Sequence, residues 1–160
     1  MKQKTLAAML MAIIIGVAIC AAVVYVFLVP EFGMSLANAG DGEFMYMYAP
    51  WYWFIMGTAL PVAAALVLAF IISVNISRDR SFCMENARLL AAISILALVD
   101  GAYFFTGNVV FMLLNMNHPG VFIISMLVCF ACVAVCAAAA ALSHYARKAA
   151  ELKEQTDLTI

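Results

Sequence analysis

Four long apolar runs constrain this chain more than any other feature of its sequence. They cover residues 6–29, 51–74, 89–114 and 121–142 of a 160-residue chain. About 20 helical residues cross a hydrocarbon core of roughly 30 Å, so each run is long enough to span a bilayer. None of them shows the period-2 alternation of a membrane β-strand. The sequence therefore predicts an all-α fold, a four-helix transmembrane bundle that forms one membrane domain over residues 1–160.

The composition excludes several classes of protein. The chain is 68% hydrophobic and 11% charged, whereas a soluble domain is about half apolar and about a quarter charged. A soluble enzyme or a disordered chain is excluded on this ground. The formal net charge of −1 provides no basic face for a nucleic acid. The expected surroundings are the lipid bilayer.

The positive charges predict the orientation in the membrane. All eight Lys and Arg residues lie in the N-terminal segment, in the loop 75–88 and in the tail after residue 142. The loops 30–50 and 115–120 contain none. Basic residues near helix ends stay on the cytoplasmic side, so both termini are predicted to be cytoplasmic. The tail keeps helix-forming residues, so the fourth helix is expected to extend to about residue 154.

The first run is expected to remain as a helix. It follows Lys2 and Lys4 as a signal peptide would, and Ala37-Asn38-Ala39 resembles a cleavage site. However, its 24 residues exceed the usual 7–15 of a signal peptide. Pro30 and Glu31 also separate it from the small residues.

Asp100 is the strongest candidate for a functional residue. It follows Arg88 by twelve residues, which places it about 18 Å along the third helix, near the middle of the bilayer. An ionisable residue at this depth costs about 2.5–3.5 kcal/mol and is a functional-site hypothesis by default. One hypothesis is a protonated Asp100 that exchanges a proton or cation during transport. The other is a structural carboxylic acid that donates to Thr58 or to the Gly57 carbonyl, which Pro61 leaves without its helical donor.

The fourth run carries a stripe of cysteines. Cys129, Cys132 and Cys136 share one helix face, and Ser125, Ala139 and Ser143 extend it. Small residues let helices approach closely, so packing is the favoured interpretation. A soft-metal site with Asp100 or a redox pair is the alternative, although no His accompanies the thiols.

The aromatic segment 45–54 precedes and enters the second run. It holds both tryptophans and three of the six tyrosines. Such rings suit the headgroup level of a membrane, so an interface anchor is the favoured interpretation. A binding surface for an apolar ligand is the alternative.

The loop 75–88 and the tail resemble a known bacterial membrane family, domain of unknown function 2975. The resemblance rests on "RDRSFCMENARLL" and on the closing "AAELKEQTDLTI". The loop motif comprises Arg78, Arg80, Phe82, Glu85 and Asn86, and Cys83 stands where Ser or Thr is expected as the helix N-cap. The resemblance implies a multi-pass protein of the bacterial cytoplasmic membrane without an established activity. It also implies a helix-turn-helix regulator as a cytoplasmic partner.

No catalytic motif, cofactor motif or metal motif accompanies these features. The chain lacks a Ser-His-Asp set, a Gly-rich phosphate loop and a His-Glu motif. We therefore expect no enzyme activity, no cofactor and no metal. The favoured function is a regulatory or envelope component that acts through its cytoplasmic loop and tail. A small proton- or cation-coupled transporter that uses Asp100, with a homo-oligomer supplying the path, is the alternative.

Overall fold

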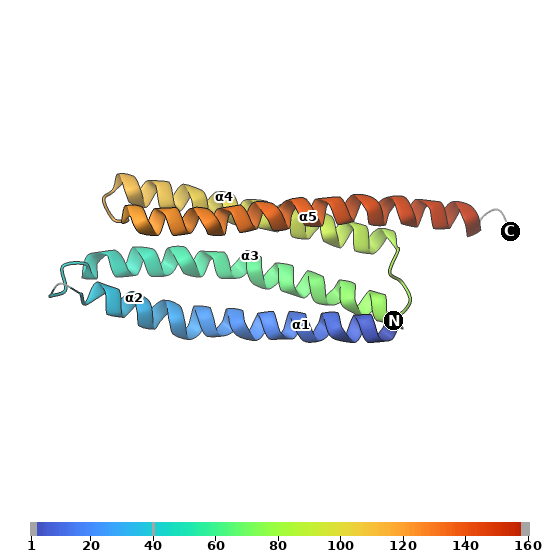
Figure 1. The fold of residues 1–160 in the computed structure, drawn as a ribbon, viewed down its shortest axis with the longest axis horizontal. Helices are drawn as coiled ribbons and strands as arrows, with labels where there is room; N and C mark the ends of the chain where they lie inside the picture. Colours follow the sequence, from blue (N-terminus) through green and yellow to red (C-terminus); the bar gives the residue numbers. More distant parts are fainter. Residues whose placement is uncertain (1–2, 40, 158–160) are drawn as a thin grey trace.

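The structure, a computed structural model, describes residues 3–39 and 41–157 of the chain. Every regular element in this described part is a helix (Figure 1). Four segments are long and apolar enough to cross a membrane: Gln3–Ala37, Met45–Ser77, Met84–Leu113 and Pro119–Thr156. The predicted all-α fold with four membrane-spanning helices is confirmed.

The first spanning segment continues beyond the apolar run from which it was predicted. It consists of α1 (Gln3–Val23), a π-helical turn η1 (Val24–Leu28) and α2 (Val29–Ala37). The sequence pattern places the end of this helix at residue 29, because Pro30 follows. Proline lacks a backbone N–H, and its ring collides with the carbonyl one turn earlier in a regular α-helix. The wider η1 turn directly precedes Pro30 and lets the helix continue through it.

The other three spanning segments are single helices. They are α3 (Met45–Ser77), α4 (Met84–Leu113) and α5 (Pro119–Asp157). The aromatic segment belongs to the first turns of α3, which begins ahead of Trp51 and includes Pro50 and Pro61. The last helix passes through the polar tail without a break, beyond the apolar run that ends at residue 142.

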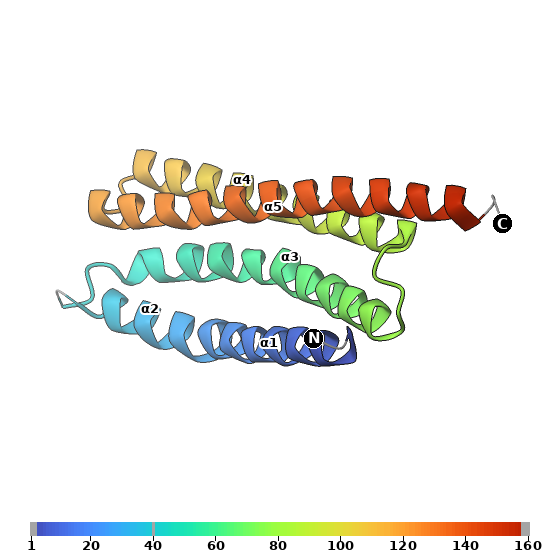
Figure 2. The same ribbon diagram turned by 45° about the vertical axis from the view of Figure 1, so that its right-hand side comes forward.

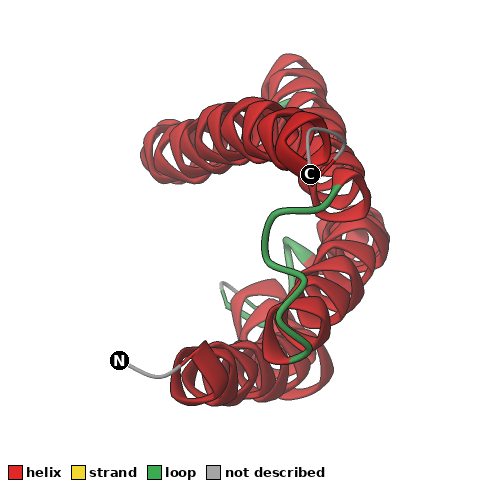
Figure 3. Cartoon of the chain, turned by 90° about the vertical axis from the view of Figure 1, so that its right-hand side faces the viewer, coloured by secondary structure: helices red, strands yellow, loops and turns green. Residues whose placement is uncertain are grey.

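The helices pack side by side in chain order. The first spanning segment packs on α3, α3 packs on α4, and α4 packs on α5. Viewed along the helices, this row curves into an open arc with the first and last spanning helices at its two ends (Figure 3). Each helix therefore leaves much of its apolar surface uncovered by protein, as suits a chain that is surrounded by lipid.

Charge divides the array into two ends, which Figures 1 and 2 show at opposite sides. The basic end holds the start of α1, the connection between α3 and α4, and the C-terminal part of α5. There the Gln3 side-chain amide donates a hydrogen bond to the Ser81 hydroxyl. The acidic end holds the connections 38–44 and 114–118, with Glu31, Asp41 and Glu43 as its charges. The side of the membrane that each end faces stays a prediction.

A seam of small residues joins α4 to α5. On α4, the buried residues Ala87, Ser94, Gly101 and Asn108 recur every seven positions. A Cβ atom added to Gly101 would lie 2.9 Å from the Cβ atom of Cys132. The two helices therefore meet closely at this point, as small residues allow in membrane helix pairs.

Two serine hydroxyl groups form hydrogen bonds across the same seam between α4 and α5. Ser94 Oγ donates to the carbonyl of Cys136 at 3.0 Å and lies 3.3 Å from the Cys136 Sγ atom. Ser143 Oγ donates to the carbonyl of Ala87 at 2.7 Å. The cysteine stripe on α5 therefore lies against α4. The Ser94 and Ser143 hydroxyl groups both find their hydrogen-bond acceptors within this helix pair.

Candidate functional site

Four polar side chains, one from each spanning segment, gather in the middle of the array. We call Tyr25, Thr58, Asp100 and Cys132 the polar set. The Tyr25 and Thr58 hydroxyl oxygens lie 2.7 Å apart, and Thr58 Oγ1 also donates to the carbonyl of Ile55 at 2.7 Å. Because a threonine hydroxyl has one proton, Tyr25 is the donor in the hydrogen bond between the two hydroxyls. The Tyr25 oxygen can therefore still accept a hydrogen bond.

Asp100 lies half-buried on α4 and lacks the partners that the sequence suggests. Its Oδ1 atom is buried and has no hydrogen-bond partner among the described residues. Thr58 is engaged by Tyr25, and the Tyr103 hydroxyl occupies the space beside Gly57 while it donates to the Phe54 carbonyl at 3.2 Å. Among the described residues the Oδ1 atom of Asp100 donates to neither Thr58 nor the Gly57 carbonyl, and a structural role for this carboxyl group stays a prediction.

The electrostatic neighbours of Asp100 come from other helices. Tyr25 on the first spanning segment and Cys132 on α5 both interact with it. The first spanning segment packs on α3 and not extensively on α4, so this interaction joins helices that are not direct neighbours in the row. Pro61 lies one turn beyond Gly57 in α3 and brings no further polar group to the set. The arrangement provides one ionisable group, one hydroxyl pair and one thiol at a shared depth.

The thiols do not form a metal centre in the described part of the chain. Cys129, Cys132 and Cys136 are all partly buried and unpaired as disulfides. No group of three His, Cys, Asp or Glu residues there is arranged to hold a metal ion. The packing of Cys132 on Gly101 and of Cys136 on Ser94 accounts for the stripe.

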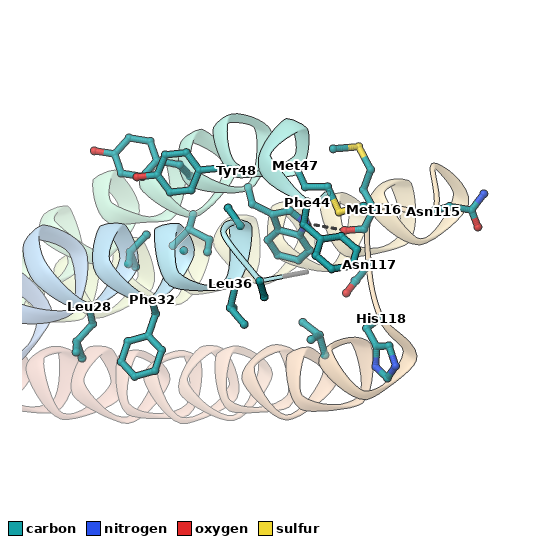
Figure 4. Close-up of a pocket in the computed structure, with 18 residues that line it drawn as sticks. Leu28, Phe32, Leu36, Phe44, Met47, Tyr48, Asn115, Met116, Asn117 and His118 are labelled. Carbon is teal, nitrogen blue, oxygen red and sulfur yellow. Dashed lines mark hydrogen bonds between the residues drawn. The ribbon is translucent and has the colours of Figure 1, made fainter. Parts of the chain in front are cut away.

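A pocket of about 710 Å³ opens at the acidic end of the array. Its wall combines η1 and α2, the aromatic start of α3, the connection 114–118 and the first turn of α5. In Figure 4 the Phe32 and Leu36 side chains of α2 point into the space between α2 and α5. The pocket therefore lies where the two ends of the arc face each other. This volume falls in the range of pockets that bury small ligands.

The aromatic segment forms one wall of this pocket. Met47, Tyr48, Trp51, Tyr52 and Ile55 all line it. The indole N–H of Trp51 donates to the Met116 carbonyl at 2.7 Å, which fixes the ring against the connection between α4 and α5. Trp53, by contrast, is 71% exposed and does not line the pocket. The segment therefore includes rings that line the pocket and one ring, that of Trp53, that faces outward, as an interface anchor is expected to do.

A close approach between α3 and α4 holds this wall in place. Phe54 is buried, and its ring packs on the rings of Phe104 and Phe111 at centroid distances of 5.5 and 5.2 Å. A Cβ atom added to Gly107 would lie 2.0 Å from Cε2 of Phe54. Only glycine at position 107 leaves room for this ring.

The pocket and the polar set lie close together along two helices. Val29 and Ile55 line the pocket, and Tyr25 and Thr58 lie about one helical turn from them on the same helices. Two members of the polar set therefore lie near the pocket, whereas Asp100 and Cys132 are not part of its lining.

The loop motif at the basic end is organised around Asn86. This residue is 1% exposed, accepts a hydrogen bond from Asn75 Nδ2 at 2.8 Å, and donates to the carbonyls of Arg80 and Ser81 at 2.9 and 3.0 Å. Glu85 forms an exposed ion pair with Arg80 at 3.3 Å. Cys83 is the N-cap of α4 and makes no side-chain capping bond.

The remaining residues of the motif face outward. Arg78 and Phe82 are exposed, Phe82 by 62%. The structure thus divides the motif into a buried clamp, Asn86 with Asn75, and an exposed surface that includes Phe82.

The sequence pattern did not identify three polar residues that form interactions in the structure. Tyr25 lies within an apolar run and carries no signal apart from its hydroxyl. Asn75 attracts notice only as part of a glycosylation sequon, yet it pairs with Asn86. Asn108 is fully buried in α4, and Asn117 Nδ2 donates to its Oδ1 atom at 3.2 Å. An intramembrane asparagine is a signal that could have identified Asn108.

Comparisons with known proteins agree with these observations. The chain is 26% identical over 168 residues to a protein of Bacillus subtilis (strain 168) named "Uncharacterized membrane protein YoaS", and the match covers 99% of each chain. No solved structure matches the chain. A family model described as "Protein of unknown function (DUF2975)" matches residues 35–160, which include the loop motif and the tail. The chain therefore belongs to the DUF2975 family of membrane proteins, as the sequence motifs predict.

Proposed function

We propose that this protein is a non-enzymatic regulatory component of the bacterial cytoplasmic membrane that acts on a cytoplasmic partner through its basic end. The observation that carries the proposal is the projection of α5 beyond the array. Ser143 bonds to Ala87 in the first turn of α4, and α5 continues from there to Asp157. These fourteen further residues extend about 21 Å beyond the contact with Ala87 at 1.5 Å per residue.

The projecting part of α5 has the surface of a docking element. It carries Arg147, Lys148, Glu151, Lys153 and Glu154, all of them exposed. Leu152 is also exposed among these charges. A mixed-charge helix with an exposed apolar residue, at the same end of the array as the exposed Phe82 of the loop motif, offers the apolar anchor and polar rim that protein interfaces use.

The test is direct binding of a partner of the kind that the family resemblance implies, a small helix-turn-helix regulator. The full chain is placed in nanodiscs and titrated with the purified, fluorescently labelled regulator. Deletion of residues 151–160 and the substitution Phe82→Ser should each weaken binding at least about tenfold, a change of about 1.4 kcal/mol. Leu127→Ser, an exposed position in the first third of α5 and far from the basic end, is the matched control. Unchanged binding by the deleted chain, or no binding by the full chain, would contradict the proposal.

A second candidate function, proton- or cation-coupled transport, is favoured by the Oδ1 atom of Asp100. A buried carboxyl oxygen without a partner is costly unless a proton or cation joins it for part of a cycle. Proton flux into liposomes measures this function. Transport predicts flux with the wild-type chain, none with Asp100→Asn, and full flux with Thr106→Val on the exposed side of the same helix. Equal flux for the wild type and Asp100→Asn would exclude transport through Asp100.

A further inference from the structure

We infer that the pocket at the acidic end binds a cationic amphiphile, with its hydrocarbon chain in the cavity and its ammonium group at the acidic mouth. This binding site goes beyond the proposed regulatory function, which depends on the basic end. Three features of the pocket lead to this ligand class: its apolar lining, the acidic residues that adjoin the lining residues in the chain and the aromatic rings in its wall.

The lining selects a hydrocarbon chain. From Leu28 to Ala37 the first spanning segment contributes apolar side chains and glycine to the wall, over about 14 Å of helix at 1.5 Å per residue. Phe32 and Leu36 are exposed and face the gap between α2 and α5 (Figure 4). An extended chain that lies along this gap would cover both side chains and remove their apolar surface from contact with solvent or headgroups.

The charges select the sign of the headgroup. Between Lys4 and Arg78 the chain has no Lys or Arg, and none occurs between Arg88 and Arg147. Asp41 and Glu43 lie between the lining residues Ala39 and Phe44, and Glu31 adjoins Phe32. The formal charges at this end are therefore all negative. They attract an ammonium group and repel a sulfate, phosphate or carboxylate.

The aromatic part of the wall favours the same headgroup. Tyr48 and Trp51 add ring faces that attract cations.

Fluorescence of Trp51 tests the inference, because the chain has only two tryptophans. Trp53→Phe leaves Trp51 as the reporter in the pocket, and Trp51→Phe leaves Trp53 as a reporter of the surrounding membrane. Each chain is placed in phosphatidylcholine nanodiscs and titrated with terminally dibrominated dodecylammonium, whose bromine atoms quench tryptophan on contact. Dodecyl sulfate with the same brominated chain is the matched ligand of opposite charge.

We expect Trp51 quenching to saturate at roughly tenfold lower mole fraction with the ammonium than with the sulfate. Trp53 quenching should rise without saturation and equally for both. Asp41→Asn combined with Glu43→Gln should reduce the preference at the mouth without removing saturation. Val121→Phe should fill the cavity and abolish saturation, whereas Ile123→Phe, two residues further on the exposed side of α5, should leave it unchanged.

Two results would overturn the inference. Equal saturation by the ammonium and the sulfate would show a pocket for hydrocarbon chains without charge selection. Unsaturable quenching of Trp51 by both ligands would show that the cavity holds no amphiphile. Neither result bears on binding of the regulator at the basic end, so failure here is distinct from failure of the proposed function.

Discussion

At the residue scale, a few tightly packed positions determine how neighbouring helices pack against each other. Phe54 occupies the space that a Cβ atom at position 107 would need. Asn86 satisfies three polar groups of the loop at the basic end with one side chain. Neither role follows from the sequence, because a glycine or an asparagine in a helix has many other uses. Only the packing of α3 against α4 shows which groups these two residues contact.

Gly107→Ala is expected to destabilise the protein. The added methyl group forces the Phe54 ring out of its place between α3 and α4, and overpacking of this kind costs about 1–3 kcal/mol. Denaturant or thermal unfolding in detergent measures the loss. Gly16→Ala is the control, because a Cβ atom there has nothing within 4 Å and should leave stability unchanged or slightly raised. Equal stability of the wild type and Gly107→Ala would contradict the packing of Phe54.

Asn86→Ala should also lower stability, by about 2 kcal/mol or more, because it leaves buried hydrogen-bonding groups of the loop without partners. The neighbouring Glu85→Gln removes only the exposed ion pair with Arg80 and should cost less than about 1 kcal/mol. The same unfolding assay compares the two variants. A loss for Glu85→Gln as large as that for Asn86→Ala would show that the ion pair, and not the buried clamp, holds the loop.

At the scale of elements, hydrophobic periodicity predicts the helices well and their ends poorly. Each apolar run lies within one spanning helix, apart from Leu114 at the C-cap of α4, because lipid leaves the backbone no other way to satisfy its hydrogen bonds. The first helix was predicted over the apolar run that ends at residue 29, but it continues through Pro30 to Ala37, with η1 ahead of the proline. The stripe on α5 was visible in the sequence. Its counterpart on α4, at Ala87, Ser94, Gly101 and Asn108, was not recognised, because these small and polar residues share only their spacing.

The seam between α4 and α5 predicts a disulfide. In a chain that retains only Cys136, the substitution Ser94→Cys places a thiol where the Ser94 Oγ atom lies 3.3 Å from Cys136 Sγ. Mild oxidation should cross-link the two helices nearly completely, as loss of alkylation by a thiol reagent would show. Ile95→Cys, at an exposed position next along α4, should not form the cross-link. A cross-link of equal yield from position 95 would show that α4 faces α5 differently.

At the scale of the whole molecule, the open arc sets this protein apart from a closed pore. The first and last spanning helices do not pack along each other, so the inner face that carries the pocket and the polar set opens sideways. The number of helices, the distribution of charge and the prominence of Asp100 could be read from the sequence. The arc, the pocket and the neighbours of Asp100 could not, since they depend on which helix faces lie together.

The account as a whole requires the acidic end to face outside the cell and the basic end to face the cytoplasm. Cysteine accessibility measures this directly, in a chain whose five cysteines are replaced and which then receives either Asp41→Cys or Leu152→Cys. Intact cells are treated with a membrane-impermeant maleimide before and after permeabilisation. We predict that position 41 is labelled in intact cells and that position 152 is labelled only after permeabilisation. The reverse pattern would place the projecting helix outside the cell and would contradict a regulatory role in the cytoplasm.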